Sequence, residues 1–146
     1  MDLTKEYPRS VREELHGVVQ LPRTIDKAKA SAARQLGDYT YNCPMDEALF
    51  ALLGIDHAAF LEVVRNASND REIETYAKQF TDKKSVEEIQ TWNHYWLSRA
   101  PEPGTEMETY FLGLRDQMAP ERTDVRTWVD LLDLDEKRDV PQRAPA

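Results

Sequence analysis

Closely spaced signals for the beginnings and ends of helices run along this 146-residue chain, and they constrain its fold more than any other feature. A Ser or Thr stands three positions before a Glu in Ser10–Glu13, Ser85–Glu88 and Thr105–Glu108. This spacing is typical of a capping box at a helix start. Pro22 and Gly37 bracket a further segment, because proline suits the first turn of a helix and glycine suits the left-handed position after its end.

Apolar residues between these signals recur every three or four positions, which places them on one face of a helix. Two such stripes are Ile25, Ala28, Ala32 and Leu36, and Ile89, Trp92, Trp96 and Leu97. Alternation with a period of two is confined to short runs such as Tyr39–Tyr41, too short to predict a sheet. We therefore predict an all-α fold, an irregular single-domain bundle of seven or eight short helices. Residues 1–138 form the predicted helical domain, and residues 139–146 a surface or frayed tail that contains two prolines.

Charge and cysteine content exclude several classes of protein. The net charge of −8 is a poor match for a phosphate backbone, so no nucleic-acid partner is expected. The longest apolar runs are far shorter than the ~20 residues of a membrane span, and no secretory leader is recognisable, so no membrane partner is expected. The single cysteine, Cys43, allows no internal disulfide and fits a reducing compartment. The predicted location is the cytoplasm.

The predicted helix between Pro22 and Gly37 is basic in an otherwise acidic chain. Its charged residues are Arg23, Lys27, Lys29 and Arg34 on the basic side and Asp26 on the acidic side. Arg23 and Lys27 lie four residues apart near the helix start, where cations oppose the helix dipole and each other. Two interpretations stay open. Arg23 and Lys27 bind a phosphate or carboxylate at the helix start, or carboxylates elsewhere in the chain neutralise them.

The loop after this helix combines two phenols, an amide and a thiol just before the next helix: Tyr39, Tyr41, Asn42 and Cys43. A cysteine at a helix start can be reactive, but a catalytic cysteine needs a base within hydrogen-bond reach. The three histidines stand far apart in the sequence. The alternatives are a buried, inert Cys43 and tyrosines that serve as packing residues with a tethered hydroxyl.

No motif predicts a metal site or a cofactor. Glu13 and His16 form one Glu-x-x-His, whereas di-iron bundles use two such motifs with further glutamates. The segment Asp130–Arg138 gathers carboxylates that could bind Mg²⁺, but it ends in two cations. Ion pairing between this segment and the basic helix is the favoured interpretation, and it would join the two ends of the chain.

Asn93 interrupts an apolar stripe between Trp92 and Trp96. A half-buried amide must be hydrogen-bonded, so Asn93 is expected to bond a backbone carbonyl or to line a pocket. The tryptophans are expected in the core, and an exposed one would indicate a partner surface.

Six segments carry a resemblance to a known family: Asp2–Ser10, Leu21–Ala28, Tyr39–Pro44, Leu53–Asp56, Glu88–Asn93 and Asp130–Arg138. With these segments the chain resembles a bacterial family of domains of unknown function, number 5069 in the usual naming. Leu21–Lys27, read as Leu-Pro-Arg-x-x-Asp-Lys, is the most specific part. Family members often read Gly-Gly-Tyr where this chain reads His16-Gly17-Val18. The resemblance implies one helical bacterial domain and supplies no activity.

Three hypotheses for function follow. The leading one is a non-catalytic binding or regulatory protein with a small anionic ligand or a protein partner at Arg23, Asp26, Lys27, Tyr39, Tyr41 and Cys43. The second is an enzyme that acts on a phosphorylated or carboxylated metabolite. In it Arg23 and Lys27 bind the anion, and Tyr41 or Cys43 carries out the chemistry. The third is a structural interaction module in which the basic helix is buried against the acidic C-terminal segment.

Overall fold

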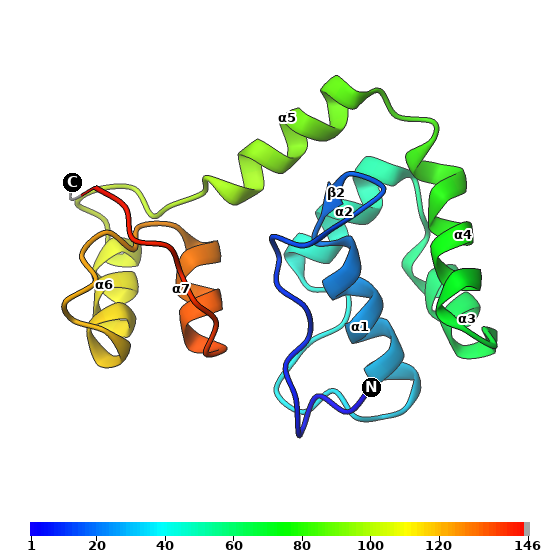
Figure 1. Cartoon of the computed structure of the whole chain (residues 1–146), viewed down its shortest axis with the longest axis horizontal. Coiled ribbons are helices and arrows are strands. Elements are labelled where there is room, and N and C mark those ends of the chain that lie inside the picture. The colour runs from blue at the N-terminus through cyan, green and yellow to red at the C-terminus, as the bar shows by residue number, and fades with distance from the viewer. Residues whose placement is uncertain (145–146) are drawn as a thin grey trace. The chain divides into compact units, whose positions relative to one another are not determined.

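The computed structural model describes residues 1–144, and within them it contains seven α-helices and one two-stranded hairpin (Figure 1). The elements are β1 (Glu14–Leu15), β2 (Val18–Val19), α1 (Leu21–Ala32), α2 (Pro44–Leu53), α3 (His57–Asn66), α4 (Asp70–Thr81), α5 (Val86–Leu97), α6 (Glu106–Met118) and α7 (Trp128–Asp135). The all-α prediction is confirmed. None of the described helices has the length and apolar character needed to cross a bilayer.

By its internal contacts the chain divides into two compact units, Met1–Asn93 and His94–Ala146, with the boundary inside α5. Each unit has its own hydrophobic cluster. The single domain over residues 1–138 stays a prediction. Caps and periodicity indicate where helices begin and end, but they do not indicate which helices share a core.

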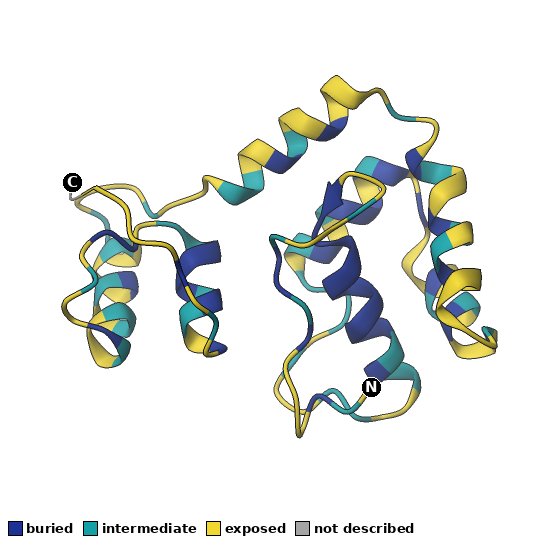
Figure 2. Ribbon diagram, viewed as in Figure 1, coloured by how far each residue is buried: buried dark blue, intermediate teal, exposed yellow. Residues whose placement is uncertain are grey.

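Helix α1 lies at the centre of the first unit and packs against α3. Its first turns are buried on every side, as the dark ribbon in Figure 2 shows. The core residues of this unit come from α1 to α5 and include Leu21, Ile25, Ala28, Leu49, Phe50, Phe60, Ile73, Ala77 and Ile89. Ala28 is fully buried, which agrees with close helix packing at small residues.

The end of α1 differs from the prediction that Gly37 closes the helix. The helix ends at Ala32, and Arg34 adopts the left-handed conformation with a φ of 57°. Gly37 has a φ of 59° and serves a different purpose, because a Cβ there would stand 3.0 Å from the Leu3 carbonyl oxygen. The N-terminal segment runs past this point, with Leu3 N–H donating to the Gln35 carbonyl at 2.9 Å. Glycine therefore permits a close approach of two chain segments.

The segment after Ser10 is also not the predicted helix. The backbone N–H of Ser10 does donate to the Glu13 carboxylate at 3.2 Å, as a capping box requires. However, His16 and Gly17 have φ values of 53° and 79° and turn the chain back into the β1–β2 hairpin. Positive φ at both central residues is the geometry of a tight hairpin turn, and it overrides the local cap.

Asn93 fastens this hairpin to α5. Its side-chain oxygen accepts a hydrogen bond from Val19 N–H at 3.2 Å, and its Nδ2 donates to the Gly17 carbonyl at 2.8 Å. The residue is buried. The expectation that Asn93 bonds a backbone carbonyl is therefore confirmed.

The second unit has a smaller core of Phe111, Val125, Leu131 and Val140. Arg122 donates to the Val140 carbonyl at 2.8 Å, and Arg143 N–H donates to the Asp124 carboxylate at 2.8 Å. These bonds fasten the predicted tail to the unit at residues 140 and 143, and Val140 is buried in its core. Residues 145–146 lie outside the described residues.

Replacing Asn93 with Ala should destabilise the protein by about 1–3 kcal/mol, because it leaves the buried Val19 N–H without its partner and removes the bond to the Gly17 carbonyl. Urea unfolding followed by circular dichroism measures the change. Asn66→Ala, at the exposed end of α3, is the matched control and should stay within about 0.5 kcal/mol of wild type. Equal stabilities for the two variants would contradict the role of Asn93.

Candidate functional site

The basic residues predicted to form a site are largely buried. Arg23, Asp26 and Lys27 on α1 are 4%, 1% and 3% exposed. Buried charges need partners, since an ion removed from water without compensation is very costly. The site is therefore defined by the partners that these three side chains find.

Lys27 lies at the centre of a cluster of polar side chains. Its Nζ stands 2.6 Å from Oδ2 of Asp46, at the start of α2. The same nitrogen donates to the Thr40 carbonyl at 3.0 Å and to Sγ of Cys43 at 3.2 Å. An ammonium has three protons, and here each has an acceptor inside the protein.

Asp46 is fully buried and gathers the other half of this cluster. Its Oδ1 accepts hydrogen bonds from the Thr24 hydroxyl at 2.5 Å and from Gln20 Nε2 at 2.9 Å. Its Oδ2 also accepts from the Cys43 backbone N–H at 3.2 Å, which caps α2. We call Gln20, Thr24, Lys27, Cys43 and Asp46 the buried ion-pair cluster.

Burial opposes the ionisation of Asp46, yet the pKa of its carboxyl lies below the usual value of 3.8. The Lys27 ammonium and the hydrogen bonds from Lys27, Thr24 and Gln20 outweigh the cost of burial. Asp46 is thus held as a carboxylate. Gln20 meets it from the N-cap of α1 in a left-handed conformation, with a φ of 71° that is uncommon outside glycine.

Asp26 and Arg23 find their partners on a second segment, at Arg9. The Asp26 carboxylate accepts from the Arg9 backbone N–H at 2.8 Å and from its Nε and Nη2 at 3.0 Å each. Such a two-pronged contact is among the stronger ion pairs. Arg23 Nη1 donates to the Arg9 carbonyl at 3.0 Å, and its guanidinium lies 5.5 Å from the ring centre of Tyr39.

Tyr41 joins α2 to α3. Its hydroxyl donates to the His57 carbonyl at 2.7 Å, and its ring meets Phe50 edge-on with centroids 6.1 Å apart. Burial, together with the charges of Asp46 and Asp56, raises the pKa of Tyr41 far above its usual value. The phenol therefore stays protonated and serves as a hydrogen-bond donor.

The six predicted residues thus divide among separate contacts: Lys27 bonds Cys43, Arg23 lies against Tyr39, Asp26 pairs with Arg9, and Tyr41 bonds the His57 carbonyl. Each buried charge of α1 has a partner within the chain. The carboxylate partner of Lys27 is Asp46, within the first unit. Pairing between the acidic segment Asp130–Arg138 and the basic helix stays a prediction. Within the second unit, Asp130 pairs with Arg143 and Glu136 pairs with Arg138.

Sequence reasoning missed Arg9, Gln20, Thr24 and Asp46. One signal was present, because Asp46 stands three positions after Cys43, where an acidic residue can cap the start of the Pro44 helix. Among residues 1–144, no group of three or more His, Cys, Asp or Glu side chains is placed to bind a metal ion.

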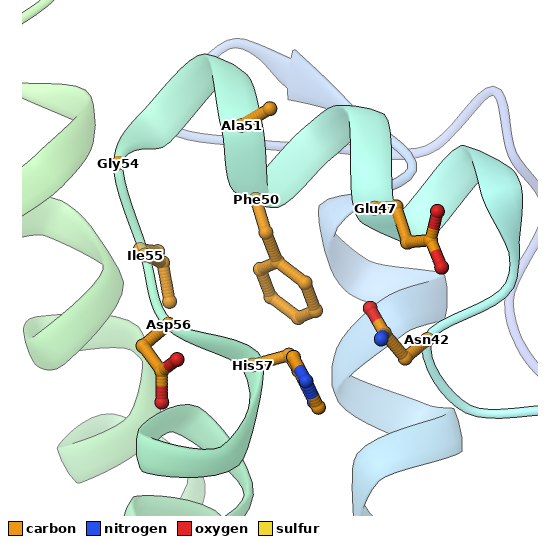
Figure 3. A pocket seen from close by; sticks show the side chains of 8 residues that line it. All are labelled: Asn42, Glu47, Phe50, Ala51, Gly54, Ile55, Asp56 and His57. Atoms are coloured by element: carbon orange, nitrogen blue, oxygen red, sulfur yellow. The ribbon is translucent and has the colours of Figure 1, made fainter.

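A cavity of about 450 Å³ lies between α2 and the start of α3 (Figure 3). We call it the α2–α3 cavity, and it is lined by Asn42, Glu47, Phe50, Ala51, Gly54, Ile55, Asp56 and His57. Figure 3 shows the Phe50 ring between Ile55 on one side and Asn42 with Glu47 on the other. Apolar side chains and a few polar groups thus share one open cavity.

The family described as Domain of unknown function (DUF5069) matches residues 5–138. The chain belongs to this family. The match covers most of the chain and confirms the resemblance found in the sequence. No curated protein matches the chain. The description of the DUF5069 family assigns no activity, so a proposal for function must rest on the site itself.

Breaking the buried Lys27–Asp46 pair from either side should cost about 3–5 kcal/mol, because Lys27→Met or Asp46→Asn leaves one buried charge uncompensated. The double variant should lose clearly less than the sum of the two single losses. Chemical unfolding measures the free energy of unfolding of the two single variants and of the double variant. Lys78→Met, in the exposed Lys78–Asp82 pair, is the control and should cost at most about 1 kcal/mol. Additive losses at positions 27 and 46 would show that the pair is not coupled.

The lowered pKa of Asp46 predicts a dependence of stability on pH. A carboxyl with a folded-state pKa below its unfolded value stabilises the fold at neutral pH, and this contribution is lost as the pH falls below 3.8 through the folded-state pKa. The stability difference between wild type and Asp46→Asn should therefore be large at pH 7 and shrink toward pH 2. Urea unfolding across this range measures it. A constant difference would show that Asp46 does not titrate as described.

Proposed function

We propose that this DUF5069 protein is a non-catalytic binding protein that holds a small, positively charged ligand in the α2–α3 cavity. The observation that carries the proposal is a cavity lined by two carboxylates and an aromatic ring. Glu47 and Asp56 line the same cavity as the Phe50 ring. Carboxylates attract a cation, and the face of an aromatic ring adds to that attraction within about 6 Å.

Both carboxylates have acceptor capacity to spare. Glu47 is exposed and has no ion-pair partner within residues 1–144. Asp56 uses Oδ2 to cap α3 by accepting from Ala59 N–H at 2.9 Å, but a carboxylate has further lone pairs. Asn42 and His57 add hydrogen-bonding groups to the wall. A cavity with an apolar floor and a few polar groups is the usual form of a small-molecule site.

The walls of the cavity are held in place from beneath. Tyr41 ties the loop before α2 to the start of α3 through its bond to the His57 carbonyl. Phe50 in the cavity wall contacts Phe60, with ring centroids 5.5 Å apart. The Lys27 bond to the Thr40 carbonyl fixes the segment that leads to Asn42. A site that is formed before binding loses less entropy when the ligand enters.

The anion site around Arg23 and Lys27 stays a prediction, and the geometry favours it less than the cavity. All three protons of the Lys27 ammonium already have protein acceptors. An anion would have to displace Asp46, which is fully buried. The protein as a whole carries a charge of −8, which favours cationic ligands over anionic ones.

The enzymatic alternative draws on Tyr41 and Cys43. The Tyr41 hydroxyl is committed to the His57 carbonyl, and its raised pKa keeps it protonated, so it is a poor base. The group that faces the Cys43 sulfur is the Lys27 ammonium, which is itself bound to Asp46. Within residues 1–144, neither side chain donates a hydrogen bond to a basic side chain that could activate it. The single cysteine and the resemblance to bacterial sequences lead us to place the protein in the bacterial cytoplasm.

A thermal-shift assay with small cations and anions tests the proposal. Agmatine and tryptamine should raise the melting temperature, whereas succinate and inorganic phosphate should not. At a concentration of 100 times Kd a ligand stabilises the folded state by about 2.7 kcal/mol. Each kcal/mol corresponds to roughly 2–4 °C for a chain of this size.

Glu47→Gln should abolish the shift caused by the amines, because it removes one carboxylate from the cavity. Glu87→Gln, an exposed glutamate of α5 outside the cavity, makes the same change in net charge and should leave the shift intact. Equal shifts in the two variants would refute the site. A shift with phosphate that Arg23→Ala removes would instead support the anion site.

A further inference from the structure

Helices α6 and α7 of the second unit pack through an aromatic contact. The rings of Phe111 and Trp128 meet edge-on, with centroids 5.0 Å apart and planes at 84°. Beside this contact lies a cavity of about 500 Å³. We call it the α6–α7 groove, and it is lined by Tyr110, Leu114, Met118, Trp128, Leu131, Leu132 and Asp135.

The groove continues as an apolar stripe along α6. Met107, Tyr110, Leu114 and Met118 follow one another at spacings of three and four, so they share one face of the helix. Met107 is 54% exposed and Tyr110 is 60% exposed. Large apolar side chains that stand in water along a groove mark an interaction site. Methionines suit such a surface, because their flexible side chains adapt to a partner.

The shape and spacing of this surface fit a third helix. Two packed helices with an apolar groove between them bind an amphipathic helix, which lays its apolar face along the groove. The charge of the groove sets the charge of that helix. Asp135 is the one charged residue among the described lining residues, it is exposed, and no ion pair to it is found within residues 1–144.

A second copy of this chain does not supply such a helix. Its one basic helix, α1, is buried over its first turns. The first turns of α2, α4, α5, α6 and α7 carry acidic residues, which Asp135 would repel. Helix α3 has no acidic first turn, but its apolar residues Phe60 and Val64 are buried in the core of the first unit. The occupant is therefore a different protein.

We propose that the α6–α7 groove binds a basic amphipathic helix of a partner protein, with apolar residues at spacings of three and four and a Lys or Arg that meets Asp135. The proposal is independent of the ligand in the α2–α3 cavity, since the two sites share no residue. The partner thus adds a second binding function on the other unit.

Fluorescence anisotropy with a labelled amphipathic peptide of leucine and lysine tests the proposal on the full chain. The matched probe is the same peptide with glutamate in place of lysine. The lysine peptide should bind, and the glutamate peptide should bind several-fold more weakly or not at all. Equal binding of both peptides, or binding of neither, would overturn the proposal.

Variants separate binding in the groove from general attraction to an acidic protein. Tyr110→Ala should weaken the binding of the lysine peptide about fivefold or more, because truncating an exposed aromatic anchor removes a large part of the contact. Tyr95→Ala on α5, where Tyr95 is 56% exposed, should leave the affinity unchanged. Similar losses in both variants would count against the groove. Because both tyrosines are largely exposed, both variants should fold, which circular dichroism checks.

The charge of the groove is tested in the same way. Asp135→Lys should weaken the binding of the lysine peptide several-fold more than Glu87→Lys does. The second variant makes the same change in net charge on the first unit. Equal effects would mean that only net charge matters. Sedimentation of the free protein completes the test. A dimer that Tyr110→Ala dissociates would make a second copy the occupant and overturn the proposal.

Discussion

The ion pair between Lys27 and Asp46 is the interaction on which the first unit depends. It joins α1 to α2 in a place that water does not reach, and there each oxygen and each proton of the pair has a partner. The pair also sets the course of the loop from Thr40 to Cys43. Asn42 and Tyr41 take their positions beside the α2–α3 cavity because that loop is fixed. A buried ion pair adds little net stability to a fold, but an arrangement that leaves one of its two charges buried alone is strongly destabilised. The pair therefore favours the arrangement of α1 and α2 in which Lys27 meets Asp46.

The sequence indicated much of the fold because helix boundaries are decided locally. Asp56, Asn69 and Thr105 each cap a helix through a backbone N–H only three residues away, so the signal and its effect lie in one short segment. The two failures came from demands outside the segment that carries the signal. Gly37 was needed for the approach of the Leu3 carbonyl and not for the end of α1. At Ser10–Glu13 the cap formed, but the turn at His16 and Gly17 directed the chain into a hairpin.

The candidate site was predictable only in part, for the same reason. Helical spacing and adjacency placed Arg23, Asp26 and Lys27 near the tyrosine-containing loop. In the structure Arg23 lies against Tyr39 and Lys27 bonds the Thr40 carbonyl. Their partners, Arg9 and Asp46, lie 14 to 19 positions away from them in the sequence and meet them only through packing. A basic helix in an acidic chain is equally consistent with a ligand site and with buried ion pairs. Only the burial and the partners of its side chains distinguish the two interpretations. The α2–α3 cavity left no motif, because its lining residues are individually ordinary.

The full pairing of the Lys27 ammonium and the Asp46 carboxylate also limits how this protein can evolve. A change at position 27 alone or at position 46 alone passes through a form with a stranded charge. Single substitutions at either position are therefore disfavoured, whereas a simultaneous replacement of both residues is tolerated. Related sequences should then keep both residues or exchange them together. The exposed pair Lys78–Asp82 is free of this restriction and can vary one residue at a time.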